Sequence, residues 1–176
     1  MPRLLERMGV ECVCVNCEPT GEFAHNPEPL PSNLVELSEA VVANGADFGI
    51  SVDPDVDRLA LICENGQPFG EEYTLVSVAD YLLSRIYNEA LETGKSIEEI
   101  AAPYQMVTSS NLSSSRALRD VTEQYGGEYC TAAVGEVNVT TKMREAGALI
   151  GGEGNGGVIY PALHYGRDAM VGVALF

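Results

Sequence analysis

The segment Phe48–Cys63, FGISVDPDVDRLALIC, decides how the rest of this 176-residue sequence is interpreted. Three aspartates alternate within it ahead of a single arginine, at Asp53, Asp55, Asp57 and Arg58. Apolar runs of strand length flank these residues, which predicts a strand, an acidic loop and a return strand. Carboxylates held this close raise one another's pKa unless positive charge lies between them. Arg58 offsets one charge, and a divalent cation such as Mg2+, which prefers oxygen ligands, would offset the rest.

A calcium-binding EF-hand is excluded as an interpretation of the acidic loop, and two other interpretations stay open. An EF-hand needs a glycine at its sixth position, where Arg58 stands, and helices rather than strands at its flanks. A phosphatase that forms an aspartyl-phosphate could use Asp53 as its nucleophile. A solvated acidic turn without a ligand is the remaining possibility.

The composition narrows the class of protein. A net charge of −16, with lysine only at Lys95 and Lys142, disfavours nucleic acid and anionic membranes as partners. The acidity suits either a salty cytosol or an ordinary acidic protein whose basic surfaces lie elsewhere. No apolar run reaches the length of about 18 residues that a transmembrane helix needs, and the N-terminus does not resemble a signal peptide. The sequence therefore predicts a cytoplasmic protein.

The cysteines predict reduced thiols in the core rather than a metal cluster. A closed zinc site needs a second pair of ligands, and the remaining cysteines, Cys63 and Cys130, stand alone. The motif Cys12-x-Cys14-x-x-Cys17 overlaps Val10–Val15, which has the pattern of a strand. Cysteine in a strand behaves as a small buried apolar residue.

Helices and strands alternate along the chain, which predicts the α/β class. Helices are expected at 2–8, 34–43 (capped by Ser32 or Asn33), 73–87, 115–125, 137–146 and 168–175. Strands are expected at 10–15, 48–52, 59–63, within 100–107, at 129–134, at 149–150 and at 158–160, with a loop over 18–32. We expect two α/β units joined near 67–72. Because the first helix has no strand before it, we also expect a fragment of a longer protein.

A second candidate site is the glycine-rich stretch Gly151–Gly157, GGEGNGG, which follows a predicted strand. Glycines let the backbone approach a ligand closely. The Glu153 carboxylate can accept from two hydroxyls, and the Asn155 amide can both donate and accept, a combination that suits a sugar. The stretch matches neither a dinucleotide-binding fingerprint nor a Walker loop. A flexible turn without a ligand is the alternative.

Other polar stretches carry weaker signals. Residues 108–115 could bind a phosphate at the start of the next helix, although a polar loop with Ser113 or Ser114 as N-cap explains them better. His25 and His164 have no serine or cysteine partner at a recognisable spacing. We interpret both histidines as loop residues that form hydrogen bonds.

Together these stretches resemble the α-D-phosphohexomutases, which comprise phosphoglucomutase, phosphomannomutase and phosphoglucosamine mutase. Asp53–Arg58 resembles the family's metal loop, Asp-Gly-Asp-Gly-Asp-Arg, and Gly152–Gly156 resembles its sugar loop, Gly-Glu-x-Ser-Gly. Asn16–Pro29 resembles the segment that precedes the metal loop. The His25-Asn26-Pro27 stretch is not the family's Ser-His-Asn-Pro phosphoserine loop, because Ala24 supplies no nucleophile.

The resemblance implies two consecutive three-layer α/β/α domains with mixed sheets. Residues 1–68 would form most of the family's domain 2, without its first strand, and residues 69–176 most of domain 3, truncated in its last helix. The phosphoserine of domain 1 and the phosphate-binding loop of domain 4 would be missing partners, so the chain alone should be inactive.

The resemblance also implies roles for the candidate residues. Magnesium (Mg2+) held by Asp53, Asp55 and Asp57 would neutralise a phosphoryl group that moves between positions 1 and 6 of a hexose phosphate. Arg58 would stabilise that group, and the residues that bind sugar hydroxyls would be Glu153 and Asn155.

Three departures from the family pattern leave the particular sugar open. They are Asn155 in place of Ser, Gly157 in place of His, and Val137 or its neighbours in place of a basic residue. An aspartyl phosphatase and a non-catalytic module that binds metal or sugar remain the alternatives.

Overall fold

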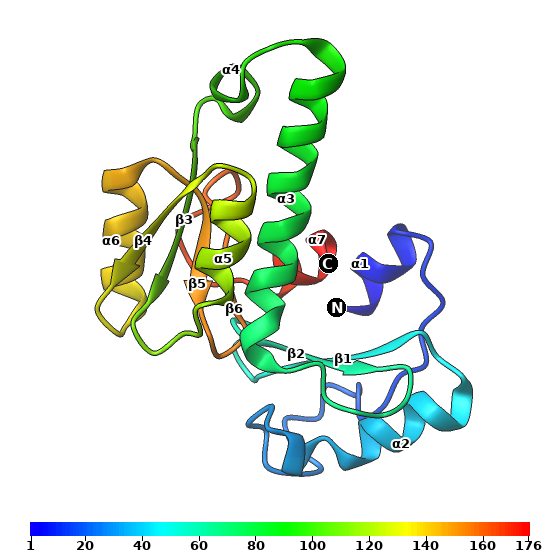
Figure 1. The fold of residues 1–176 in the computed structure, drawn as a ribbon. Coiled ribbons are helices and arrows are strands. Elements are labelled where there is room, and N and C mark those ends of the chain that lie inside the picture. The colour runs from blue at the N-terminus through cyan, green and yellow to red at the C-terminus, as the bar shows by residue number, and fades with distance from the viewer.

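The computed structural model describes residues 1–176 as two α/β units that meet at the long helix α3 (Figure 1). The first unit contains α1 (Pro2–Arg7), η1 (Pro31–Asn33), α2 (Val35–Asn44), β1 (Phe48–Val52) and β2 (Leu59–Cys63). The second contains α3 (Glu71–Thr93), α4 (Ile97–Ala101), β3 (Gln105–Asn111), α5 (Ala117–Gln124), β4 (Glu128–Ala132), α6 (Glu136–Ala146), β5 (Ala148–Glu153), β6 (Gly157–Ile159) and α7 (Ala169–Leu175). None of these helices is both long and apolar enough to cross a bilayer.

The first unit is built on the antiparallel pair β1 and β2, whose register runs from Phe48 opposite Cys63 to Val52 opposite Leu59. Both strands begin and end at the predicted residues. The helix α2 packs on the pair and ends at Gly45 in the left-handed region, as the Asn-Gly signal predicts. This geometry brings the acidic loop to the end of the pair that faces the second unit.

The second unit has a four-stranded mixed sheet in the order β4-β3-β5-β6. The strands β4, β3 and β5 are parallel, and β6 is antiparallel to β5. One apolar cluster packs α3 and α5 on the sheet, and a separate cluster packs α6. These three layers confirm the α/β/α architecture that the resemblance implied.

The two units share a core and a backbone hydrogen bond. The amide of Leu59, at the start of β2, donates to the carbonyl of Gly156, at 3.1 Å. Residues of α1, β2 and α7 form one buried cluster, namely Leu5, Leu59, Leu61, Ala169 and Val173. The acidic loop and the glycine-rich stretch are therefore held side by side.

The predicted strand at Val10–Val15 is wrong. These residues are irregular, and no strand pairs with them. A strand needs a partner for its backbone groups, and β1 and β2 pair only with each other in this unit. The core interpretation of the neighbouring cysteines fails with it: Cys12 is half-buried, whereas Cys14 and Cys17 are exposed. All five cysteines are free.

The prediction of a polar loop at 108–115 is also wrong in its first half. Thr108–Asn111 is not a loop but the buried second half of β3. Hydrogen bonds make this burial possible, because Thr108 bonds with Thr122 and Ser110 with the Tyr129 hydroxyl. The predicted side-chain caps of α2 and α5 are absent as well, since Leu34 and Arg116 hold those positions without capping bonds.

Gly156 should be intolerant of any side chain, because it has φ +87° and a Cβ there would collide with the Leu59 carbonyl. Gly126 is the matched control: it has φ +75° with no atom within 4 Å of a built Cβ. We expect Gly126→Ala to cost about 1 kcal/mol of unfolding free energy, from backbone strain alone. Gly156→Ala should cost about 3 kcal/mol or more, because the collision adds to the strain. Urea unfolding of both variants measures the difference, and equal costs would contradict the close approach of the two units.

Candidate functional site

The acidic loop gathers three carboxylates at one point. Oxygens of Asp53, Asp55 and Asp57 all lie within 4.8 Å of one another. Asp53 is buried, Asp57 half-buried and Asp55 exposed, so the group opens to solvent on one side. The Asp53 Oδ1 accepts from the backbone amides of Asp57 and Arg58, each at 3.0 Å. The loop therefore folds around Asp53 and leaves Asp55 exposed to solvent.

The acidic loop also contains a strained residue. Val56 has φ +60°, which is a rare conformation for a β-branched side chain. Its amide donates to the Asp53 carbonyl at 3.1 Å, and its carbonyl accepts from the amide of Ala169 at 3.0 Å. The start of α7 thus fixes the strained turn. Strain of this kind persists where surrounding structure enforces it, which is common at functional sites.

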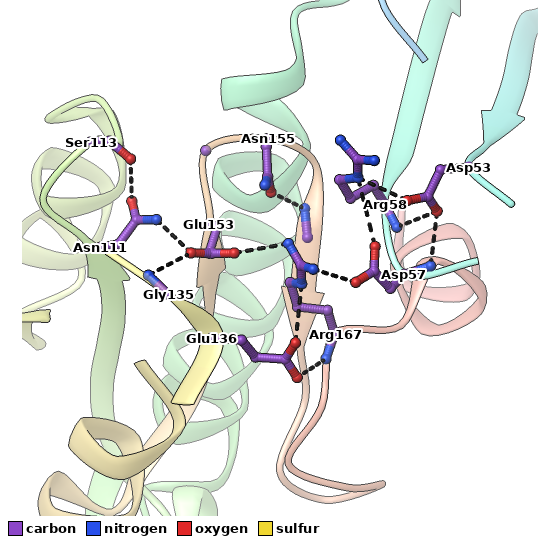
Figure 2. Close-up of polar contacts among 12 residues, drawn as sticks. Asp53, Asp57, Arg58, Asn111, Ser113, Gly135, Glu136, Glu153, Asn155 and Arg167 are labelled. Carbon is purple, nitrogen blue, oxygen red and sulfur yellow. Dashed lines mark hydrogen bonds and ion pairs between the residues drawn. The ribbon is translucent and has the colours of Figure 1, made fainter. Parts of the chain in front are cut away.

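Arg58 is held by carboxylates on two sides. Its Nε donates to Asp53 Oδ2 at 2.8 Å (Figure 2). Its two Nη atoms donate to both oxygens of Glu28, at 2.5 and 3.3 Å. The hydrogen bonds that Arg58 donates to Glu28, and then to Asp53, raise its pKa, so the guanidinium stays charged. Glu28, in the proline-rich loop, is a site residue that the sequence analysis did not identify.

The two inner carboxylates have opposite pKa shifts. Burial acts to raise the pKa of Asp53, but hydrogen bonds from the backbone and side chain of Arg58 and from Asp57 lower it overall. Burial and the adjoining Asp53 carboxyl raise the pKa of Asp57 to about 6, against the attraction of Arg167. The Asp57 Oδ1 is buried without a hydrogen-bond partner. Asp53 is thus stabilised in its charged form, whereas Asp57 is not.

The glycine-rich stretch places Glu153 at the end of β5, where the residue is 5 % exposed. Its Oε1 accepts from Asn111 Nδ2 at 2.7 Å and from the Gly135 amide at 3.3 Å. The Asn155 Oδ1 accepts from the Gly157 amide at 3.3 Å, which leaves the Asn155 amide nitrogen free for a ligand. The two predicted sugar ligands therefore differ: Glu153 is held rigidly, and Asn155 is half-exposed.

Glu153 and Asn155 line one cavity of about 510 Å³. Its other lining residues are mostly polar: Glu71, Glu72, Asn111, Ser113, Val134, Gly135, Glu136, Gly154 and Arg167. Ser113 and Ser114 do not cap α5, because their hydroxyls donate to Asn111 Oδ1 at 2.9 and 2.8 Å. The serine-rich segment therefore orients Asn111, which in turn orients Glu153.

Arg167 joins the acidic loop to this cavity, and the sequence analysis did not identify it (Figure 2). Its Nη2 pairs with Asp57 Oδ2, and its Nη1 donates to Glu153 Oε2 at 2.8 Å. Asp57 lies 110 positions earlier in the chain, so no local pattern could indicate the contact. The predicted roles of the histidines as hydrogen-bonding loop residues hold, because His25 contacts the Asn26 carbonyl and His164 contacts Asp168.

Comparison with known families gives two matches that together cover most of the chain. Residues 1–66 match phosphoglucomutase/phosphomannomutase, α/β/α domain II. Residues 74–176 match α/β/α domain III of the same family.

Individual relatives agree with these matches. A phosphoglucomutase/phosphomannomutase of Thermococcus kodakarensis is 37 % identical over 99 % of the chain, and a probable phosphoglucosamine mutase of Methanopyrus kandleri is 33 % identical over 98 %. The chain spans 35 % of the length of each of these relatives. A solved phosphoglucomutase/phosphomannomutase family protein of Burkholderia thailandensis superposes with a TM-score of 0.80 and 28 % identity, over 98 % of this chain and 35 % of that one. The chain therefore belongs to the phosphoglucomutase/phosphomannomutase family and carries its α/β/α domains II and III.

Proposed function

We propose that this chain supplies the metal-binding and sugar-binding parts of a magnesium-dependent phosphohexomutase. The reaction would move a phosphoryl group between positions 1 and 6 of a hexose phosphate through a phosphoserine and a bisphosphate intermediate. The observation that carries the proposal is the adjacency of the two loops: Arg167 binds Asp57 of the acidic loop and Glu153 of the cavity at the same time. A cation site beside a hydroxyl-binding site is what phosphoryl transfer on a sugar requires.

The acidic loop fits magnesium in its donor set and in its unsatisfied charge. Carboxylate oxygens are the preferred ligands of this hard ion, and those of Asp53, Asp55 and Asp57 lie close enough to share one. The unpartnered Asp57 Oδ1 is the kind of buried acceptor that an ion would satisfy. When bound, the ion would neutralise charge on the transferring phosphoryl group.

The chain's own groups would bind and orient the rest of the substrate. Arg58 would donate charge-assisted hydrogen bonds to the phosphoryl group once its Nη atoms exchange Glu28 for it. Glu153 and Asn155 would hold neighbouring sugar hydroxyls. Because the chain spans 35 % of its relatives, we propose that the nucleophilic phosphoserine and the phosphate-binding loop lie in domains I and IV of the complete enzyme.

The local geometry disfavours the two alternatives, an aspartyl phosphatase and a non-catalytic module that binds metal. An aspartyl nucleophile needs an oxygen that can reach the substrate, but Asp53 is 2 % exposed and both of its oxygens accept hydrogen bonds. A dedicated calcium module would surround its ion with six to eight oxygens. The acidic loop brings together three carboxylates, fewer oxygens than such a module would supply.

The raised pKa of Asp57 predicts how stability depends on pH without metal. The folded-state pKa of about 6 lies above the ordinary 3.8, so the folded chain binds more protons than the unfolded chain between these values. Stability should therefore fall as pH rises through that window. Asp57→Asn should stabilise the chain by about 1–3 kcal/mol at pH 7, and the gain should vanish near pH 4. Urea unfolding in EDTA at several pH values measures this dependence.

The exposed carboxylate Asp120, on α5, provides the control for that series. Asp120→Asn should show no comparable gain at pH 7. A destabilising effect of Asp57→Asn at neutral pH would contradict the assignment of Asp57 as a carboxylate kept at the expense of stability.

Sugar binding tests the proposed substrate class directly. Saturation-transfer NMR with α-D-glucose 1-phosphate and MgCl2 should show weak binding, because we place the phosphate-binding loop in domain IV, outside the matched domains II and III. Glu153→Gln should weaken this binding about tenfold, through loss of a charged acceptor. Glu89→Gln, on the exposed face of α3, should leave it unchanged.

Phosphorus NMR of the same samples separates the alternatives. We expect neither glucose 6-phosphate nor inorganic phosphate to accumulate. Release of inorganic phosphate that Asp53→Asn abolishes would favour the phosphatase. Equal sugar binding by the Glu153 and Glu89 variants would overturn the sugar-binding role of the glycine-rich stretch.

A further inference from the structure

We propose that Arg167 is a positioning residue that couples the acidic loop to the sugar cavity. A change of charge or of bound ligand at either site would then alter the interactions of Arg167 at the other. The coupling of metal affinity to the cavity rests on the function proposed above. The physical link between the loops does not, because it is present in the chain without any ligand.

The geometry divides one guanidinium between two sites. Arg167 Nη2 pairs with Asp57 Oδ2, and Nη1 donates to Glu153 Oε2 at 2.8 Å. The planar fork of arginine can hold two carboxylates at once, which a lysine ammonium on a flexible stem does less well. The side chain is 18 % exposed, so water screens these pairs only partly.

Glu136 anchors this arginine from the start of α6. Its Oε1 accepts from the Arg167 backbone amide at 3.1 Å, and its Oε2 lies 3.3 Å from Nε. The base of the side chain is therefore fixed, while its two terminal nitrogens face different loops. A small rotation of the guanidinium would strengthen one terminal contact and weaken the other.

The charges indicate the direction of the coupling. Arg167 neutralises part of Asp57, one of the three carboxylates offered to a cation, so it competes with a cation for that group. If Glu153 loses its charge, Arg167 is drawn more fully to Asp57 and the competition increases. Linkage requires the reverse effect as well. A cation that displaces Arg167 from Asp57 would leave the guanidinium charge of Arg167 more fully paired with Glu153.

The first experiment measures the physical link in EDTA, without metal. Urea midpoints are compared for Asp57→Asn, Glu153→Gln and the double variant, in the native chain and in chains carrying Arg167→Gln. With Arg167 present, the two shifts should not add, because both carboxylates bind one guanidinium. With glutamine at 167 they should add within error. Additive shifts in the native chain would overturn the coupling.

The second experiment measures Mn2+ binding by electron paramagnetic resonance, with Mn2+ as the probe for the acidic loop. Arg167→Gln should tighten binding about tenfold, because a competing positive charge leaves the site. A merely structural role would give the opposite sign, since a distorted loop binds the ion less well. Arg85→Gln removes the same charge from an exposed position about 20 Å along α3 from Glu72 and should change little.

Glu153→Gln supplies the decisive comparison in the same titration. In the native chain it should weaken Mn2+ binding about threefold, by freeing Arg167 for Asp57. With Arg167→Gln or Arg167→Lys the effect should largely disappear, because neither residue bridges both loops. An effect of the same size in all three backgrounds would mean direct electrostatics and would overturn the proposal.

Different results overturn the Arg167 link and the proposed metal site. Non-additive urea midpoints with no Mn2+ binding in any variant would support the Arg167 link and overturn the proposed metal site. Mn2+ binding that Asp55→Asn weakens and Arg167→Gln leaves unchanged, with additive urea midpoints, would support the metal site and overturn the link.

Discussion

The structure depends on one close approach of backbone to backbone, between Leu59 and Gly156. The 3.1 Å hydrogen bond from the Leu59 amide ties the strand that leaves the acidic loop to the turn that follows Glu153. It can form only because Gly156 has no side chain and adopts a positive φ. Both residues belong to motifs that look independent in the sequence. Their contact holds the two loops side by side, close enough for Arg167 to pair with Asp57 and Glu153.

Electrostatics at this junction follow from that approach. Two arginines each bridge two carboxylates across it. Arg58 pairs with Glu28 and Asp53. Arg167 pairs with Asp57 and Glu153. Each arginine is shared by carboxylates from different segments, and negative charge remains in excess. Pairs of this kind contribute little net stability once desolvation is counted. Their effect is to fix the positions of the acceptors before any ligand arrives, which lowers the cost of ordering them on binding.

The sequence predicts the elements that depend on neighbouring residues. It does not predict the elements and site residues that depend on tertiary contacts. The strands β1 and β2 and the acidic loop between them follow from apolar runs and turn chemistry within 16 residues of sequence, 48–63. Val10–Val15 has the same apolar pattern but no neighbouring strand, so it stays irregular. Thr108–Asn111 looked like a loop because its polar partners come from other elements. Arg167 and Glu28 could not be identified, because their ion-pair partners lie far away in the chain.

The departures from local rules are concentrated in the acidic loop. Val56 holds a backbone conformation that suits glycine, the pKa of Asp57 is raised, and one Asp57 oxygen has no partner. The positive φ of Val56, the raised pKa and the unpartnered oxygen each cost stability, although the Val56 side chain packs against the cluster that joins the two units. Asp57→Asn would relieve the cost at that position without disturbing β1 or β2, so the fold alone does not require a carboxylate there. This cost falls where three carboxylates converge, which supports the proposal that the acidic loop is shaped for a positively charged ligand.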